Sequence, residues 1–575
     1  MKAALANSAW LAGCLPALAR FRRATKRVAE TQSSILRRTL AANQDTEFGR
    51  EHRFGSVTTV ADYQSLVPLC DYESCSPDIL RIAAGERNVL TSEPVRLFEP
   101  TSGSSGAQKW VPYNRALQRE FQAGIRAWIA DLFLHEPGVL GGEAYWSVSP
   151  ALTVQRKTAG GIPIGFEEDA DYVGAWQKGL VNSLMAVPSE VRKIRDVDAF
   201  RYVTLLFLLR NRNLRLISVW NPAFLTMLLA PLQNCADTLI ADLKLGTISV
   251  QSEIPQILRH KFVADPWRAE EVRSALKAAD PAAIHQQLWP RLCVVSCWSD
   301  ANSEAAAKAL AGLFPQAWLQ AKGLLATEGF VSFPLHGHQG SALAISSHFL
   351  EFLPVNEAGH RDFERPQLAH ELDLGQRYAV VLTTGGGLYR YQLQDVVEVM
   401  TRLGDCPTIR FVGRLGCVSD WFGEKLNEVH VAGILRDVFN RVGISPAFAM
   451  VACDPDSSKP GYTLFIESQT TLETLHQARL AVEERLRDNF HYNYARNLGQ
   501  LAELRVFRTS DGAETYLKSK MANGQRGGDI KPTALDRGGQ WSRIFRGEFL
   551  GEAVQHSAAH GVISDWNVPL LSYHS

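Results

Sequence analysis

The sequence of 575 residues lacks the features that mark several large classes of protein. Its 60 basic residues are balanced by 60 acidic ones, so no excess charge indicates nucleic acid or an anionic membrane as a partner. No stretch reaches the roughly 18 consecutive apolar residues of a membrane-spanning helix. The nine cysteines form no C-x-x-C pair, which argues against a zinc site or a disulfide framework. We therefore expect no nucleic acid, no membrane, and mostly buried, reduced thiols.

Motifs of several common enzyme families are also missing. There is no Walker A spacing, no H-E-x-x-H and no G-x-S-x-G elbow. The three glycines at 385–387 do not have the spacing of a dinucleotide-binding fingerprint. His336 and His338 are close in sequence, but no second cluster completes a metal site. P-loop ATPases, NAD enzymes, zinc peptidases and serine hydrolases are thus disfavoured.

The N-terminus contains a segment, Leu11-Ala-Gly-Cys14, that is similar to a lipoprotein cleavage box. Only one lysine precedes it, and Asn7 and Ser8 interrupt the apolar stretch, so it makes a poor export signal. We expect instead an amphipathic helical region over residues 3–40, and a cytoplasmic protein.

The composition, 46% hydrophobic and 21% charged, is that of a globular protein long enough for two or more cores. A helical pattern ending at Leu209, an apolar strand over 214–220 and an apolar helix from after Pro222 to Leu239 alternate, which indicates an α/β architecture. Residues 378–414 predict successive strands separated by glycine turns, hence a β-rich subdomain.

A second unit follows towards the C-terminus. A helix to about Arg441 precedes strands at 446–453 and 462–468, a helix at 471–490 and a strand at 502–509. We therefore predict a large N-terminal domain with α/β sheets and the β-rich subdomain, and a small mobile C-terminal α+β domain. The predicted bounds are 1–428 for the large domain, 429–434 for the hinge and 435–575 for the small lid domain.

A loop rich in glycine and hydroxyl side chains precedes a lysine near residue 100. Glycines allow the backbone to approach a polyphosphate, N–H and hydroxyl groups donate to its oxygens, and a lysine adds a mobile charge. By composition alone, a segment of this kind is more often an ordinary loop. Its residues are Thr101, Ser102, Gly103, Ser104, Ser105, Gly106 and Lys109.

Two acidic residues and one lysine stand out further along. Glu328, in Ala326-Thr-Glu-Gly329, could hold Mg²⁺ or be a surface carboxylate. Asp395 lies on an apolar strand and could accept the hydroxyls of a ribose or form an ion pair with Arg390 or Arg402. Lys531 lies in a glycine-rich segment that composition alone describes as a solvated loop.

These segments, in this order and over nearly the whole chain, resemble the Gretchen-Hagen-type acyl acid amido synthetases, an auxin-responsive family of the adenylate-forming superfamily, in its bacterial-type members. Further stretches that resemble the family are Val219-Trp-Asn-Pro222 and Cys297-Trp-Ser-Asp300. The resemblance implies an adenylate-forming ligase fold.

The resemblance also implies roles for individual residues. It makes the loop from Thr101 to Lys109 the phosphate loop, Thr327 an α-phosphate contact and Glu328 the Mg²⁺ ligand. It assigns Tyr389, Asp395 and Arg414 to the nucleotide site, and Lys425 and Lys531 to catalysis at the hinge and on the mobile domain.

Three positions depart from the family pattern. Ser104 replaces a threonine, Gln394 replaces a glycine beside Asp395, and no arginine follows Pro532. The second departure adds a side chain where the pattern has backbone freedom.

The function that follows is activation of a small carboxylic acid by ATP and Mg²⁺ as an acyl-adenylate, then transfer to an amine, an amino acid, to form an amide. The helix after the phosphate loop would supply Arg126 and Trp128 to the acid pocket. We expect a monomer. Alternatives are an acyl-CoA-forming adenylate ligase and a catalytically weak protein that binds nucleotide or acid.

Overall fold

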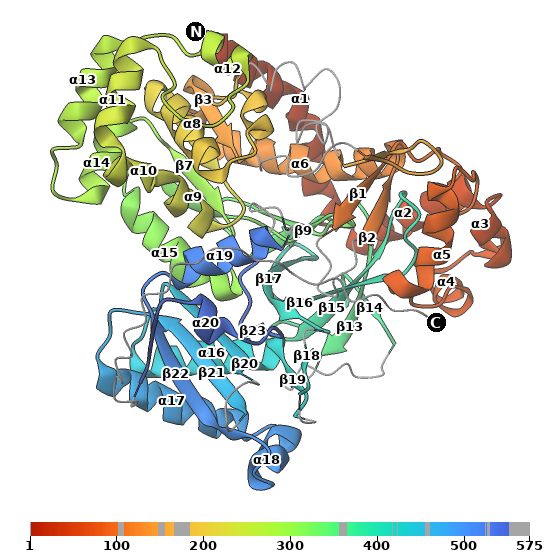
Figure 1. The fold of residues 1–575 in the computed structure, drawn as a ribbon. Coiled ribbons are helices and arrows are strands. Elements are labelled where there is room, and N and C mark those ends of the chain that lie inside the picture. The colour runs from red at the N-terminus through yellow and green to blue at the C-terminus, as the bar shows by residue number, and fades with distance from the viewer. Residues whose placement is uncertain are drawn as a thin grey trace, which may run out of the picture.

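A computed structural model describes the chain over residues 2–101, 109–147, 156–165, 184–355, 365–416, 418–421, 424–454, 460–523, 525 and 530–550. A large body carries several sheets with helices around them, and a smaller body contains one sheet (Figure 1).

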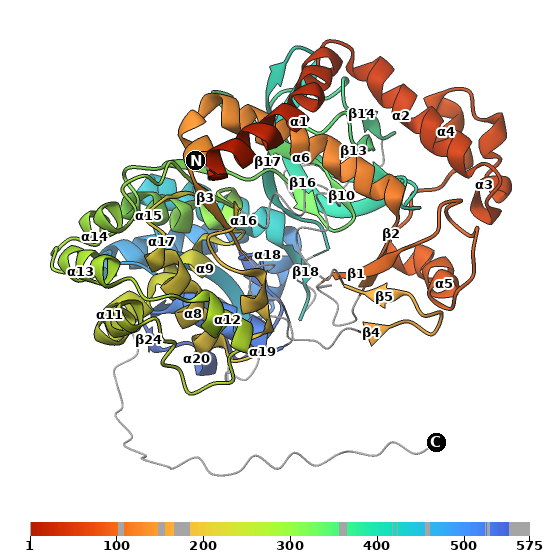
Figure 2. The same ribbon diagram turned by 90° about the horizontal axis from the view of Figure 1, so that it is seen from above.

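Two long helices open the chain. Helix α1, Lys2–Ala24, lies along α6, Arg115–His135, and buries Trp10, Leu18 and Phe21 (Figure 2). With α2, Val28–Asn43, it confirms the predicted helical region, and no described helix is both long and apolar enough to cross a membrane. Helices α3, Glu47–Glu51, α4, Val60–Leu66, and α5, Tyr72–Ala83, follow, then β1, Leu97–Thr101, β2, Lys109–Tyr113, β4, Arg156–Lys157, and β5, Pro163–Ile164.

A parallel sheet forms the α/β part of the large body. Its order is β3-β6-β7-β8, from Glu143–Trp146, Leu214–Ser218, Val294–Cys297 and Trp318–Ala321. Helix α8, Val197–Arg210, is buried at every residue from Ala199 to Leu209, as a helix enclosed in a core should be. The predicted helix after Pro222 is broken at Pro231, because proline cannot continue a hydrogen-bonded helix. The remaining helices here are α9, Pro222–Leu229, α10, Pro231–Asn234, α11, Ala236–Leu245, α12, Gln256–Lys261, α13, Pro266–Ala275, α14, Pro281–Leu288, and α15, Glu304–Leu313.

The predicted β-rich subdomain is a seven-stranded sheet of order β11-β12-β17-β16-β15-β13-β14. Its centre is antiparallel, with β16 paired on one side to β15 and on the other to β17. The two-stranded hairpin β9, Leu325–Ala326, and β10, Gly329–Phe330, precedes it. Its strands are β11, Ser332–Pro334, β12, Ser341–Leu343, β13, Phe349–Val355, β14, Gln367–Leu368, β15, Arg377–Thr383, β16, Tyr391–Leu403, and β17, Cys406–Arg414.

The small C-terminal body is a five-stranded sheet of order β23-β20-β21-β22-β24, which contains the predicted β-β-α-β unit. Helices α16 and α17 pack on one face, and α19 and α20 on the other. The predicted hinge, residues 429–434, lies inside α16 instead of in a connecting segment. The elements are β18, Val418–Ser419, β19, Leu426–Asn427, α16, Glu428–Val442, β20, Phe448–Asp454, β21, Gly461–Glu467, α17, Leu472–Leu486, α18, Phe490–Asn497, β22, Ala502–Thr509, α19, Gly512–Ala522, β23, Leu535–Asp536, α20, Trp541–Ile544, and β24, Gly547–Phe549.

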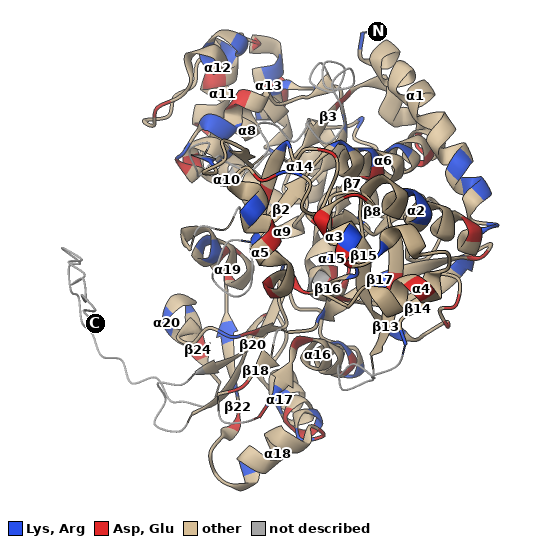
Figure 3. Ribbon diagram, turned by 90° about the vertical axis from the view of Figure 1, so that its right-hand side faces the viewer, with Lys and Arg blue, Asp and Glu red and all other residues tan. Residues whose placement is uncertain are grey.

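Basic and acidic residues are interspersed over the described helices and loops (Figure 3). This distribution agrees with the balanced composition of 60 basic and 60 acidic residues.

Candidate active site

Four of the predicted residues, from three distant parts of the sequence, converge on one cluster of charges. Asp395 is 1% exposed, and its Oδ1 lies 3.0 Å from Arg414 Nε. Its Oδ2 lies 3.8 Å from Nζ of Lys531, which belongs to the small domain. Glu328 is buried and interacts electrostatically with all three. Two carboxylates and two cations thus meet where the domains touch.

The secondary structure explains how these side chains meet. Asp395 on β16 and Arg414 on β17 are register partners, so their side chains share one face of the sheet. Thr327 and Glu328 form the turn of the β9–β10 hairpin. The two hydrogen-bonded strands and the two-residue turn between them therefore fix the position of Glu328.

Gln394, where the family pattern has glycine, adopts φ 69°, in the left-handed region. Its carbonyl accepts a hydrogen bond from the Leu415 N–H at 2.7 Å, which ties the start of β16 to the end of β17. A glycine would adopt this backbone without strain, whereas a side chain costs about 1 kcal/mol. The substitution therefore leaves the loop conformation possible but makes it less stable.

Burial governs the ionisation of the cluster. It raises the pKa of Glu328, a rise that Asp395 increases and that Arg414 and Lys531 oppose. Asp395 raises the pKa of Arg414 despite the burial of the guanidinium. Burial also raises the pKa of Glu428, at the start of α16 near Arg414 and Asp395. Three carboxylates face two cations, so the site would accept an additional positive charge.

That excess is the feature that fits a divalent cation. Among the described residues no group of three His, Cys, Asp or Glu side chains is arranged as a metal cage. Mg²⁺ in nucleotide-dependent enzymes is typically bound by one or two carboxylates together with substrate phosphates. Glu328 meets that requirement as a single buried carboxylate.

The loop that carries Lys531 is held against the large domain. The Lys531 ammonium lies 5.7 Å from the ring centroid of Trp298 and 5.3 Å from that of Phe411. The neighbouring Ile530 carbonyl accepts a hydrogen bond of 3.1 Å from the buried Asn221 side chain, at the start of α9. These contacts come from three elements of the large domain.

The predicted phosphate loop is described only at its two ends. Thr101 and Lys109 are register partners in β1 and β2, while Ser102, Gly103, Ser104, Ser105 and Gly106 lie outside the described residues. Lys109 Nζ lies 3.8 Å from Glu73 Oε1 and 5.1 Å from the Tyr72 ring centroid, both on α5. The described contacts of Lys109 are therefore with α5.

Tyr389 lies in the apolar core instead of facing the cluster. It is 2% exposed, its hydroxyl donates to the Leu90 carbonyl at 2.7 Å, and its ring stacks on Phe48. Tyr391, two residues later, lies closer to the charges: burial raises its pKa, Glu328 raises it further, and Arg414 opposes the rise. The sequence prediction missed Tyr391, although it has the same parity as Asp395 along the strand.

Three further predicted residues lie outside the cluster contacts. Lys425 is exposed, with φ 45°, just before β19. Arg126 Nη2 donates to Gln122 on its own helix, α6, at 2.9 Å. Trp128 Nε1 donates to Gln320 on β8 at 3.2 Å, so this ring packs against the parallel sheet.

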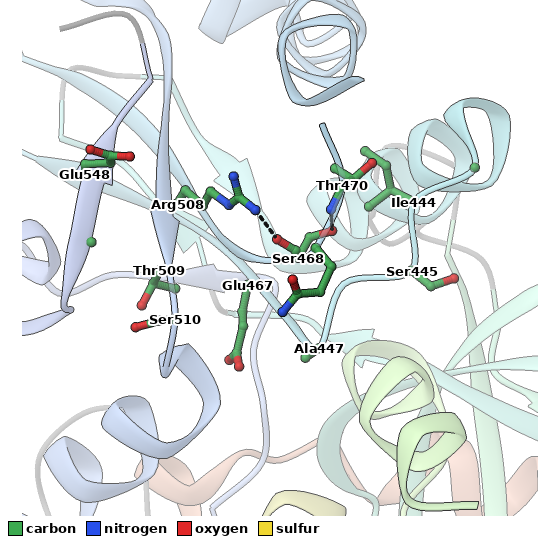
Figure 4. A pocket seen from close by; sticks show the side chains of 13 residues that line it. Ile444, Ser445, Ala447, Glu467, Ser468, Thr470, Arg508, Thr509, Ser510 and Glu548 are labelled. Atoms are coloured by element: carbon green, nitrogen blue, oxygen red, sulfur yellow. Dashed lines mark hydrogen bonds between the residues drawn. The ribbon is translucent and has the colours of Figure 1, made fainter. Parts of the chain in front are cut away.

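A separate polar groove of about 800 Å³ lies on the small domain (Figure 4). Glu467, whose pKa is raised by burial, lines it, as does Arg508, which donates to the Ser468 carbonyl at 3.2 Å. None of the predicted site residues lines this groove.

Family models match the chain over most of its length. The GH3 family N-terminal domain matches residues 17–318, the central domain 341–414 and the C-terminal domain 442–537. The chain belongs to the GH3 family. The predicted family is thereby confirmed. In this GH3 chain, Asp395 and Arg414 lie in the central match, Lys531 lies in the C-terminal match, and Glu328 lies between the N-terminal and central matches.

Curated relatives agree with this assignment. The chain is 25% identical over 564 residues to the "Probable indole-3-acetic acid-amido synthetase GH3.4" of Oryza sativa subsp. japonica, covering 91% of this chain and 88% of the relative. It is 25% identical over 430 residues to the "Indole-3-acetic acid-amido synthetase GH3.3" of Arabidopsis thaliana, covering 72% of each.

Solved structures have the same fold. "GH3.15 acyl acid amido synthetase" matches with a TM-score of 0.76, and "AtGH3.15 acyl acid amido synthetase in complex with 2,4-DB" with 0.79. Both are 20% identical to this GH3 chain and cover 92% of it and 94% of the matched chain.

Proposed function

We propose that this GH3-family protein uses ATP to activate a small carboxylic acid as an acyl-adenylate and transfers the acyl group to an amino acid, forming an amide. The names of its relatives, which it matches over most of their length, support the acid–amino acid ligase activity. The observation that carries the proposal for the site is the approach of Lys531, from the small domain, to Asp395 and Glu328 of the large domain.

In the first half-reaction, a carboxylate oxygen of the acid attacks the α-phosphorus of ATP and pyrophosphate leaves. Lys531, with Arg414 close by, would offset the negative charge that develops at phosphorus. Asp395 would then accept ribose hydroxyls while keeping its contact with Arg414. Glu328 is the residue we assign to holding Mg²⁺, which when bound would neutralise part of the negative charge of the triphosphate.

In the second half-reaction, the amino nitrogen attacks the acyl carbon, the bond to AMP breaks, and the amine proton is released. Lys531 must withdraw to give the amine access, which requires the small domain to turn. The segment before α16 moves with that domain, since the Tyr462 hydroxyl donates to Ser419 Oγ at 2.6 Å and also to Glu424. We therefore propose the pivot at Leu415 and Gly416, which has φ 81°, instead of at 429–434.

The test is exchange of labelled pyrophosphate into ATP, measured with a panel of aromatic and indole acids. Acid-dependent exchange would support adenylation, and its absence with every acid would favour a protein that only binds nucleotide or acid. Mass spectrometry of the products, with twenty amino acids or coenzyme A supplied, distinguishes amide from thioester. Sedimentation would test the monomeric state predicted from the sequence, and cell fractionation would test the predicted cytoplasmic location.

A further inference from the structure

A second lysine, Lys322, lies at the carboxyl edge of the parallel sheet. It directly follows β8, Ser218 is the last residue of β6, and Trp298 directly follows β7. In open parallel α/β sheets, ligands bind outside the carboxyl ends of the strands. Lys322 therefore lies at the edge of the sheet where parallel α/β proteins bind their ligands.

The surroundings of Lys322 are aromatic and neutral. The residue is 6% exposed, and its ammonium donates to Ser218 Oγ at 2.7 Å. The same nitrogen lies 4.7 Å from the Trp220 ring centroid and 5.2 Å from that of Trp128. Within the part of the chain that the structure describes, no carboxylate lies within ion-pair distance of Lys322. Lysine is almost never buried in this way without a charged partner.

The pKa values of Lys322 and its neighbour also indicate that the ammonium lacks a charged partner among the described residues. Burial lowers the pKa of Lys322 to about 7. Among the described residues, the titratable neighbour that acts on Lys322 is Cys297, and burial raises the pKa of its thiol to about 12, so it provides no anion at neutral pH. The aromatic faces stabilise a cation partly, but a hydroxyl and two rings do not replace the hydration of an ammonium.

A chain of contacts joins this lysine to the proposed adenylation site. The rings of Trp220 and Trp298 are 5.7 Å apart, and the Trp298 ring is 5.7 Å from Lys531 Nζ. Along the chain, only residues 323–327, which include strand β9, separate Lys322 from Glu328. An anion held at Lys322 would lie on the side of the sheet where Lys531 and Glu328 meet.

We propose that Lys322, with Ser218 beside it and Trp128 and Trp220 as walls, binds the carboxylate of the acid substrate before adenylation. The inference rests on the proposed function and deepens it, because it names the group that receives the acid. Two indole rings favour an acid with a flat, apolar body. Once the carboxylate is joined to the α-phosphorus as a mixed anhydride with AMP, its charge is lost, so its attraction to Lys322 weakens before the amine arrives.

The test compares the wild type with Lys322→Met, which keeps the length of the side chain and removes its charge. The matched control is Lys308→Met, an exposed lysine on the neighbouring helix α15. Pyrophosphate exchange is measured against benzoate, phenylacetate and indole-3-acetate, with the acid and ATP varied separately. We expect Lys322→Met to raise KM for the acid about 10- to 100-fold, since a charged hydrogen bond is lost, and to leave KM for ATP unchanged.

Binding of the same acids without ATP provides a second readout. Calorimetry at pH 8 in two buffers of different ionisation enthalpy should show proton uptake on acid binding by the wild type, and none by Lys322→Met. At pH 6, where Lys322 is already charged, the uptake should disappear.

Each outcome decides one question. An unchanged KM for the acid in Lys322→Met overturns the inference, as does a defect confined to transfer from the adenylate to the amine. Absence of exchange by the wild type with all acids instead contradicts the proposed function. A defect in Lys308→Met equal to that in Lys322→Met would also overturn the specific role of Lys322.

Discussion

Asp395 contacts two cations from different parts of the chain, Arg414 on the adjacent strand and Lys531 on the small domain. The sequence could show that Asp395 lies on an apolar strand, and it left a ribose, Arg390 or Arg402 as its partner. The two arginines were wrong: Asp395 pairs with Arg414, its register partner on the next strand, whereas Arg390 forms an ion pair with Glu351. The register that pairs Asp395 with a residue 19 positions later cannot be read from local patterns, because bulges shift it, whereas the alternation of β16 itself can.

Replacing Lys531 by alanine should lower acid-dependent pyrophosphate exchange by about 100-fold or more, because the charge acts on the transition state. Binding of ATP should be nearly unchanged, as measured by calorimetry. Lys518→Ala, at an exposed lysine of α19, is the control and should exchange like the wild type. An exchange rate for Lys531→Ala equal to that of the wild type would remove Lys531 from the mechanism.

Lys322 also predicts a pH dependence of stability. Its pKa is about 7 in the folded protein and about 10.5 in the unfolded chain, so the unfolded state binds more protons between these values. The free-energy cost of burying the charged Lys322 ammonium applies in full below pH 7 and decreases as the pH rises. The melting temperature of the wild type relative to Lys322→Met should therefore increase from pH 7 to pH 9, by the equivalent of about 1 kcal/mol per pH unit. A difference that does not change with pH would contradict a buried, titrating amine.

At the scale of elements, the hairpin that carries Thr327 and Glu328 depends on a close approach of two chain segments. A Cβ added at Gly323 would lie 2.0 Å from the Ser332 carbonyl oxygen and 2.7 Å from the Phe333 Cα, both backbone atoms. Gly323→Ala should destabilise the protein by about 1–3 kcal/mol and reduce exchange, since the hairpin must shift.

The control for that change is Gly312→Ala in α15, where the added Cβ meets nothing within 4 Å. It should leave activity unchanged and stabilise the helix by about 0.5–1 kcal/mol. Thermal unfolding and exchange, measured on both variants, check the pair. Equal melting temperatures for the two would show that the approach at Gly323 is not tight.

Long apolar elements were predictable, and short ones were not. The apolar runs of β15, β16 and β17 and of helix α8 are visible in the sequence, and the structure confirms these elements. Strands β9, β10, β18 and β19 have two residues each, too few to carry a period, and exist because their partners hold them. Pro231 was a visible reason for α9 to end, which the predicted continuous helix ignored.

At the scale of the whole molecule, the two domains meet through the loop of Lys531, which Asn221 holds. Asn221→Ser should keep the cap of α9, because serine caps equally well, but lose the bond to the Ile530 carbonyl. The orphaned carbonyl destabilises the docked state, so exchange should fall about tenfold while transfer from a supplied acyl-adenylate is unaffected.

The same substitution at another helix start is the control. Asn489→Ser, at the cap of α18 in the small domain, should change neither half-reaction. Single-turnover measurements of each half-reaction distinguish the two variants. Equal losses in both half-reactions of Asn221→Ser would indicate general destabilisation instead of weaker docking.

The central claim is that this GH3 chain adenylates an acid and then transfers it to an amino acid. The most direct measurement supplies the wild type with ATP, Mg²⁺, an acid from the panel and the amino acids, and follows pyrophosphate, AMP and the organic product together. The account predicts pyrophosphate and AMP in equal amounts with an acyl–amino acid amide, and acid-dependent exchange without the amine. ATP binding without acid-dependent pyrophosphate release, or a product found only with coenzyme A, would contradict it.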